Sequence, residues 1–223
     1  MLKGYNDNSS SDRHLPLDKF NLEDREAVKA NVPNLRYHLA NSISNKRNWR
    51  TWSNAARWVY GLLNTRLGYY PPFIEANPQG NYRHRTTNIR KVAVLDLKKS
   101  GGRSSCKKSM LDTYFDQHPE AYSFLARQIS LYGHLNFIVC CGDGVFDHFQ
   151  QIMQNSMFQN SHYVVMHKEK NYMIAENGTI IIDYRHPLLL QKGVSSKLAY
   201  TQLMEIVQSA LKEKANKMNI SQC

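Results

Sequence analysis

Short apolar runs that alternate with amphipathic stretches are the feature that most constrains how this chain folds. Three runs have the form of buried strands: "KVAVLDL" (91–97), "NFIVCCG" (136–142) and "GTIIIDY" (178–184). The apolar pair at Met1 and Leu2 indicates a fourth strand. Strands that alternate with helices favour a parallel sheet covered on both faces. We therefore predict an α/β fold, a three-layer α/β/α sandwich with a central, mainly parallel four-stranded sheet.

The predicted helices carry apolar residues on one side at helical spacing. They cover the ranges 21–43, 51–67, 109–131, 143–153 and 195–215. The last range begins at a serine, a residue that caps helix N-termini well. Asn177-Gly178, between two alternating apolar segments, predicts a hairpin turn. Residues 68–88 hold three prolines and two glycines and predict an irregular surface segment.

The size and composition of the chain predict one ordinary domain over residues 1–223. An apolar content of 42% is enough for a full core. No stretch approaches the roughly 18 apolar residues of a membrane span, and the first residues lack the apolar core of a secretory signal. We therefore expect a cytoplasmic protein with no membrane partner.

The cysteines and histidines form no recognised metal-binding pattern. Cys106, Cys140, Cys141 and Cys223 make no CxxC pair, and no histidines make an HExxH motif. We expect buried reduced thiols at Cys140 and Cys141, and neither a metal cluster nor another cofactor.

The charge balance predicts a polyanionic partner. Lysine and arginine number 29 against 18 aspartates and glutamates, which gives a formal net charge of +11. Nucleic acid is the first candidate for that partner, because each neutralised phosphate releases condensed counterions.

Polar or glycine-rich sequence follows each predicted strand. Because the carboxyl ends of parallel strands meet at one edge of a sheet, we expect these residues to form one crevice. Cations outnumber acids there, so a phosphate-bearing ligand is expected. The residues of this predicted crevice are Asn6, Asp7, Asp96, Lys98, Lys99, Arg103, Arg185 and His186.

Five segments resemble, in chain order, motifs of the uracil-DNA glycosylase superfamily. "GYND" (4–7) is similar to a strand-end Gly-x-Asp/Asn-Pro motif, and "TWSNAARW" (51–58) more loosely to a Ser-Leu-x-Asn-Ile segment. "VAVLDL" (92–97) resembles a strand ending in Leu-Asn, and "NFIVCCGDGVF" (136–146) a strand before a glycine-started helix. "DYRHPLLL" (183–190) looks like the His-Pro-Ser-Pro-Leu motif, without its serine and second proline. The resemblance implies a monomeric DNA glycosylase of that fold, acting on a flipped nucleotide in duplex or single-stranded DNA.

The resemblance also implies roles for residues near the base. Asn6 stands where the superfamily positions a water, but Asp7 replaces the usual proline, so the choice between Asn6 and Asp7 stays open. Tyr5, next to Gly4, would stack on the flipped base. His186 would donate to the base oxygen as negative charge develops there.

Other residues would hold the DNA. Arg185 would hold a flanking phosphate, and the leucines after Pro187 would fill the gap left by the flipped base. The glycine-rich segment 98–103 would clamp the backbone. The predicted DNA-contacting residues are Thr51, Asn54, Lys98, Lys99, Ser100, Gly101, Arg103, Arg185, Pro187, Leu188 and Leu189.

Asp96 stands where the superfamily motif has asparagine, and this difference bears on the choice of substrate. Asparagine presents a donor and an acceptor to uracil, whereas an ionised aspartate only accepts. Asp96 therefore favours a base with an exocyclic amino group, such as a modified cytosine of phage DNA, whose excision would serve phage defence. Uracil excision in base-excision repair, an inactive DNA-binding protein of this fold and a hydrolase of free nucleosides are the alternatives.

Overall fold

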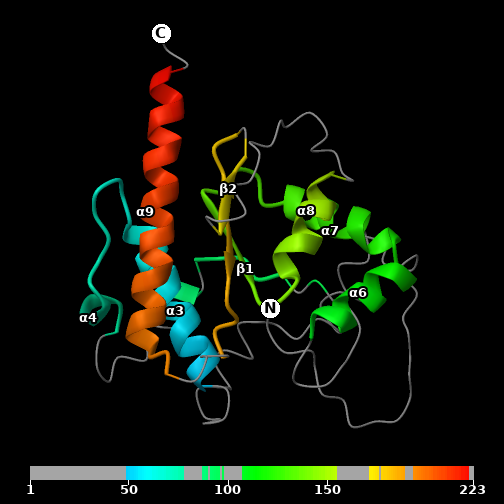
Figure 1. Cartoon of the computed structure of the whole chain (residues 1–223), viewed down its shortest axis with the longest axis horizontal. Coiled ribbons are helices and arrows are strands. Elements are labelled where there is room, and N and C mark those ends of the chain that lie inside the picture. The colour runs from blue at the N-terminus through cyan, green and yellow to red at the C-terminus, as the bar shows by residue number, and fades with distance from the viewer. Residues whose placement is uncertain are drawn as a thin grey trace.

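The structure is a computed structural model that describes residues 49–77, 87–89, 91–95, 97, 107–154, 171–175, 177–188 and 193–220. This part of the chain is a mixed α/β fold with helices on both sides of a small sheet (Figure 1). The helices are α3 (Trp49–Asn64), α4 (Phe73–Ala76), α6 (Lys108–Gln117), α7 (Glu120–Ser130), α8 (Val145–Gln154) and α9 (Ser196–Ile220). The strands are β1 (Phe137–Cys141), β2 (Tyr172–Ile174) and β3 (Ile180–Tyr184).

The sheet of the described residues has three strands in the order β1-β3-β2. β1 runs parallel to β3, with Phe137 opposite Ile180, and β2 runs antiparallel to β3, with Tyr172 opposite Ile182. The hairpin turn predicted at Asn177-Gly178 is confirmed: it joins β2 to β3, and Gly178 adopts a φ of 82° that favours glycine.

The predicted strand at 91–97 is not a strand in its described residues, 91–95 and 97. Residues 91 and 92 form a turn and a bend after the short helical piece 87–89, and Leu97 is instead buried among the side chains of α6, α7 and α8. The apolar segment 91–97 therefore contributes Leu97 to the core, although its described residues do not pair with the sheet. The strand predicted at Met1 and Leu2 lies outside the described residues, so the described part shows a smaller, mixed sheet in place of the predicted four-stranded one.

One face of the sheet packs against α6, α7 and α8. Ile181, Met173 and Cys140 alternate toward this face and join a core that includes Leu111, Phe115, Leu125 and Ile152. Cys140 is a buried free thiol, as predicted, whereas Cys141 is a free thiol that is only partly buried.

The opposite face packs against α9, with α3 and α4 beside it (Figure 1). Gly61 lets α3 approach α9 closely, because a Cβ at Gly61 would lie 2.7 Å from Sδ of Met204. The predicted serine cap is confirmed as Ser195, whose hydroxyl accepts a hydrogen bond from the Leu198 amide at 3.1 Å. In the described ranges, none of the helices combines the length and the apolar character that crossing a bilayer would need.

Candidate functional site

The carboxyl ends of β1 and β3 lie next to each other, as predicted for two of the four strand ends. The backbone N–H of Gly142, directly after β1, donates to the carbonyl oxygen of Tyr184 at 2.8 Å. A Cβ at Gly142 would lie 3.8 Å from Cβ of His186, and φ of Gly142 is 117°. The positive φ favours glycine here, and the loop after β1 lies within van der Waals distance of the loop that carries His186.

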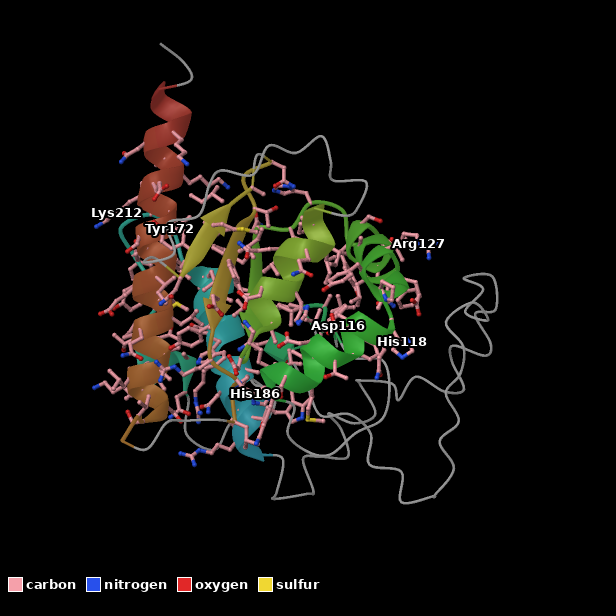
Figure 2. The ribbon with its side chains drawn as sticks, turned by 45° about the vertical axis from the view of Figure 1, so that its right-hand side comes forward. Asp116, His118, Arg127, Tyr172, His186 and Lys212 are labelled. Carbon is pink, nitrogen blue, oxygen red and sulfur yellow. The ribbon has the colours of Figure 1, made fainter. Side chains whose placement is uncertain are left out.

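His186 is partly buried at this end of the sheet, near α3 and far from Asp116, His118 and Arg127 (Figure 2). The backbone N–H of Leu188 donates to Nδ1 of His186 at 3.1 Å. A ring nitrogen that accepts a hydrogen bond carries no proton, so the neutral ring carries its proton on Nε2. The sequence after β3 thus fixes both the position of the ring and the nitrogen that can donate.

α3 holds the loop that contains His186. The side-chain amide of Asn54 donates to the carbonyl oxygen of Pro187 at 2.9 Å, and Arg57 Nη1 donates to Oδ1 of Asn54 at 2.7 Å. Thr51 and Asn54 are only 7% and 1% exposed. Such burial does not fit the direct DNA contacts predicted for these two residues. The structure instead gives Asn54 the role of anchoring Pro187.

Arg185 points toward α9. Its Nη2 donates to Oε1 of Gln202 at 2.9 Å, and its Cζ lies 5.4 Å from the centre of the Tyr184 ring. Burial raises the pKa of Tyr184 to about 12, against the lowering effect of Arg185, so the phenol stays neutral at physiological pH. An open groove of about 1010 Å³ runs beside Arg185, between the β2–β3 edge and α9.

Three aspartates lie near the same strand ends. The pKa of Asp183, on β3, is raised by burial first and then by the charges of Asp147 and Asp143. Asp147 also pairs with Lys108 of α6. In the described ranges, no three histidine, cysteine or acidic side chains are placed to hold a metal ion together.

The structure therefore brings together Asn54, His186 and Pro187, with Arg185 and Leu188 on the same short segment. Apart from the buried Thr51, the remaining predicted site residues lie outside the described ranges. They are Gly4, Tyr5, Asn6, Asp7, Asp96, Lys98, Lys99, Ser100, Gly101, Arg103 and Leu189.

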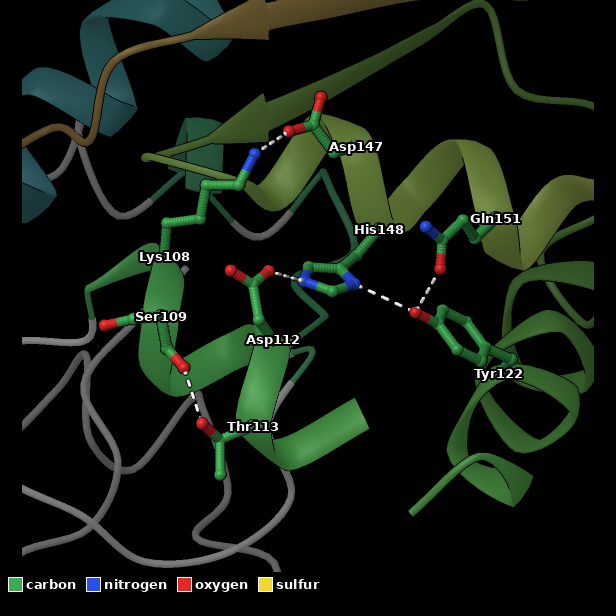
Figure 3. A network of polar contacts seen from close by, with 8 residues as sticks. All are labelled: Lys108, Ser109, Asp112, Thr113, Tyr122, Asp147, His148 and Gln151. Atoms are coloured by element: carbon green, nitrogen blue, oxygen red, sulfur yellow. Dashed lines mark hydrogen bonds and ion pairs between the residues drawn. The ribbon is translucent and has the colours of Figure 1, made fainter. Parts of the chain in front are cut away.

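Sequence reasoning missed a polar network centred on His148 of α8 (Figure 3). Nε2 of His148 lies 2.9 Å from Oδ1 of Asp112 on α6, and Nδ1 lies 3.0 Å from the hydroxyl of Tyr122 on α7. Tyr122 also donates to Gln151, and the His148 ring stacks on Phe115 with centroids 4.4 Å apart. His148 falls on the apolar stripe of its helix, and a histidine in such a stripe signals a buried ring that needs polar partners.

The order of Asp112, His148 and Tyr122 is that of an acid, a base and a hydroxyl in a row. Burial raises the pKa of Tyr122, and the charges of Asp116 and Asp112 raise it further, so the phenol resists ionisation. The network joins side chains of α6, α7 and α8.

Comparison of the chain with protein-family models, with curated proteins and with solved structures found no match to any of them.

Proposed function

We propose that this protein is a DNA glycosylase, which flips a base out of DNA and hydrolyses its N-glycosidic bond to leave an abasic site. The observation that carries the proposal is the hydrogen bond from the Leu188 N–H to Nδ1 of His186, at the joined ends of β1 and β3, which leaves Nε2 as the protonated nitrogen of the neutral ring. A neutral imidazole that can donate from Nε2 suits a reaction in which negative charge builds on a departing base. The loop geometry supports a role for His186 as that donor.

In the proposed reaction the C1′–N bond breaks, the hydroxyl of a water adds to C1′, and the proton of that water ends on the departed base. The base leaves with negative charge, which a hydrogen bond from Nε2 of His186 would stabilise by a few kcal/mol where water is excluded. Asn54 and Pro187 would keep the ring in place while this charge develops. Asn6 or Asp7 would position the water.

The charge of the chain supports DNA as the partner. The excess of 29 basic over 18 acidic residues favours a polyanion, and Arg185 would contribute one such contact at the site. Asp96 favours a cytosine-like base, so a modified cytosine is the proposed substrate. Removal of such bases from phage DNA would serve defence.

An assay of abasic sites tests the proposal. The full chain is incubated with duplex and single-stranded oligonucleotides that carry uracil, cytosine or a modified cytosine, and abasic sites are cleaved by alkali. We expect release of the modified cytosine. Release of uracil alone would reject modified cytosine as the substrate and favour uracil excision. Salt-sensitive binding without release of any base would favour an inactive DNA-binding protein.

A further inference from the structure

Arg185 has no carboxylate partner among the described residues. The ion pairs of that part of the chain join Lys108 to Asp147, His118 to Glu120, His148 to Asp112 and Lys217 to Glu213. Nη1 of Arg185 is buried and makes no hydrogen bond to the residues that the structure describes. A partly buried guanidinium normally has a counter-charge, and a buried donor without an acceptor is unfavourable. No described carboxylate neutralises the charge of Arg185, so that charge is available to an anion.

Two neighbours restrict the guanidinium. Gln202 accepts a hydrogen bond from Nη2, and the Tyr184 ring lies against the planar group. A neutral glutamine orients the guanidinium without cancelling its charge. A glutamate at this position would have bound it more tightly and neutralised it. The glutamine therefore leaves the positive charge available to a ligand.

The rest of the groove disfavours further phosphates. Beyond Gln202, α9 contributes Glu205 and Glu213 to the groove, with Lys212 between them. Carboxylates repel phosphate groups. Asp183 of β3 also lines the groove, so the groove suits at most one phosphate, at Arg185.

We propose that Gln202 is a positioning residue that orients Arg185 toward a single phosphate of the nucleic-acid strand, next to His186. This inference rests on the proposed function and deepens it, because it defines one phosphate subsite and a residue that serves it. Gln202 does not touch the base or the reacting atoms.

The test measures binding of a short fluorescent oligothymidylate to the full chain over a series of NaCl concentrations. Arg185→Gln is expected to flatten the plot of log affinity against log salt by about 0.7, the effect of one phosphate on a single strand. Gln202→Met is expected to weaken binding several-fold with the salt slope unchanged, because the charge remains. Gln202→Glu is expected to flatten the slope as Arg185→Gln does, because it neutralises the guanidinium.

Lys212→Gln is the matched control, since it removes a cation from the same groove between the two glutamates. It is expected to leave the slope unchanged. If Gln202 had only a structural role, Gln202→Met and Gln202→Glu would have the same salt slope. Thermal melting checks that each variant folds. Any one of three results would overturn the inference. They are equal salt slopes for the two Gln202 variants, an unchanged salt slope in Arg185→Gln, and a salt slope in Lys212→Gln that flattens as much as in Arg185→Gln.

A second titration separates this inference from the proposed function. Inorganic phosphate is added to the ¹⁵N-labelled full chain while the Nε–H signal of Arg185 is followed by NMR. A shift of that signal in the wild type, reduced in Gln202→Met, supports the subsite even if oligonucleotides are not cleaved. The protein could instead release bases while phosphate leaves the Arg185 signal unchanged and Arg185→Gln leaves the salt slope unchanged. That result would overturn the phosphate subsite and leave the glycosylase proposal standing.

Discussion

The side-chain amide of Asn54 in α3 donates a hydrogen bond to the carbonyl oxygen of Pro187, 133 residues later in the chain, at 2.9 Å. Both residues are buried. The bond links the start of α3 to the segment after β3, and that segment contains Arg185 and His186. The position of His186 therefore depends on a helix that is remote in sequence.

Replacement of Asn54 tests this link. Asn54→Leu leaves the carbonyl of Pro187 without its donor and Arg57 Nη1 without its acceptor, so the free energy of unfolding should fall by about 1–3 kcal/mol. Urea unfolding measures the loss. Asn64→Ala is the control on the same helix, because Asn64 is exposed and bonds only within the helix, and it should change stability by about 0.5 kcal/mol or less. Equal stability of Asn54→Leu and the wild type would contradict the anchoring role.

The bond from Leu188 N–H to His186 predicts a specific tautomer. In ¹⁵N NMR spectra of the neutral ring, Nε2 should carry the proton and Nδ1 should not. His186→Asn places an oxygen close to the position of Nδ1 and should keep the Leu188 amide protected from hydrogen exchange, whereas His186→Gln should not. Fast exchange of the Leu188 amide in the wild type would show that the bond does not form.

The His148 network predicts coupled stability among three helices. His148→Phe keeps a ring against Phe115 but removes both polar contacts, and should lower the free energy of unfolding by about 1–3 kcal/mol. Tyr122→Phe removes the hydroxyl and should lower the free energy of unfolding by about 0.5–1.5 kcal/mol. A double-mutant cycle of the two should give a coupling energy of at least about 0.5 kcal/mol. Strict additivity would mean that the His148–Tyr122 contact contributes nothing.

Asp183 predicts how stability changes with pH. The pKa of Asp183 is raised in the folded chain. Its contribution to stability is therefore complete below its pKa in the unfolded chain, about 3.9, and is lost as the pH rises through its pKa in the folded chain. Asp183→Asn cannot ionise, so it should be more stable than the wild type at neutral pH, with a flatter stability curve above about pH 4. Urea unfolding at several pH values measures both. Parallel curves for the two proteins would refute the raised pKa.

Gly61 predicts the cost of separating α3 from α9. An alanine Cβ would lie 2.7 Å from Sδ of Met204 and 2.9 Å from Cε2 of Tyr200, so Gly61→Ala should lower the melting temperature despite the better helix propensity of alanine. The expected cost is about 1–3 kcal/mol. Met204→Ala should cost less stability in the Gly61→Ala background than in the wild type, because it relieves the clash. A higher melting temperature in Gly61→Ala alone would show that the two helices are further apart.

Local sequence signals predicted much of the described fold. The apolar stripe of α3, the Asn177-Gly178 turn and the Ser195 cap each involve neighbouring residues, and each is present. The prediction for 91–97 was wrong over its described residues, because a short apolar run suits a buried irregular segment as well as a strand. The predicted helix 109–131 is two helices, and Pro119 lies at the break between α6 and α7.

The site was predictable only where it follows a strand directly. Gly142 is one residue past β1 and His186 is two residues past β3, and the parallel pairing of the two strands brings them together. The anchoring of Pro187 by Asn54 and the hold of Gln202 on Arg185 depend on how α3 and α9 pack, which no short pattern encodes. The same holds for Asp112, Tyr122 and His148, which come from three different helices.

Base release by three His186 variants tests the central claim most directly. The wild type, His186→Gln, His186→Asn and His186→Ala are assayed for abasic sites on the same modified-cytosine DNA, after melting curves confirm that each variant folds. Gln can donate from about the position of Nε2, whereas Asn and Ala cannot, so we predict that His186→Gln retains more activity than the other two. Removal of one such donor should cost about 10²–10³-fold in rate. Base release by His186→Ala at the wild-type rate would contradict the account.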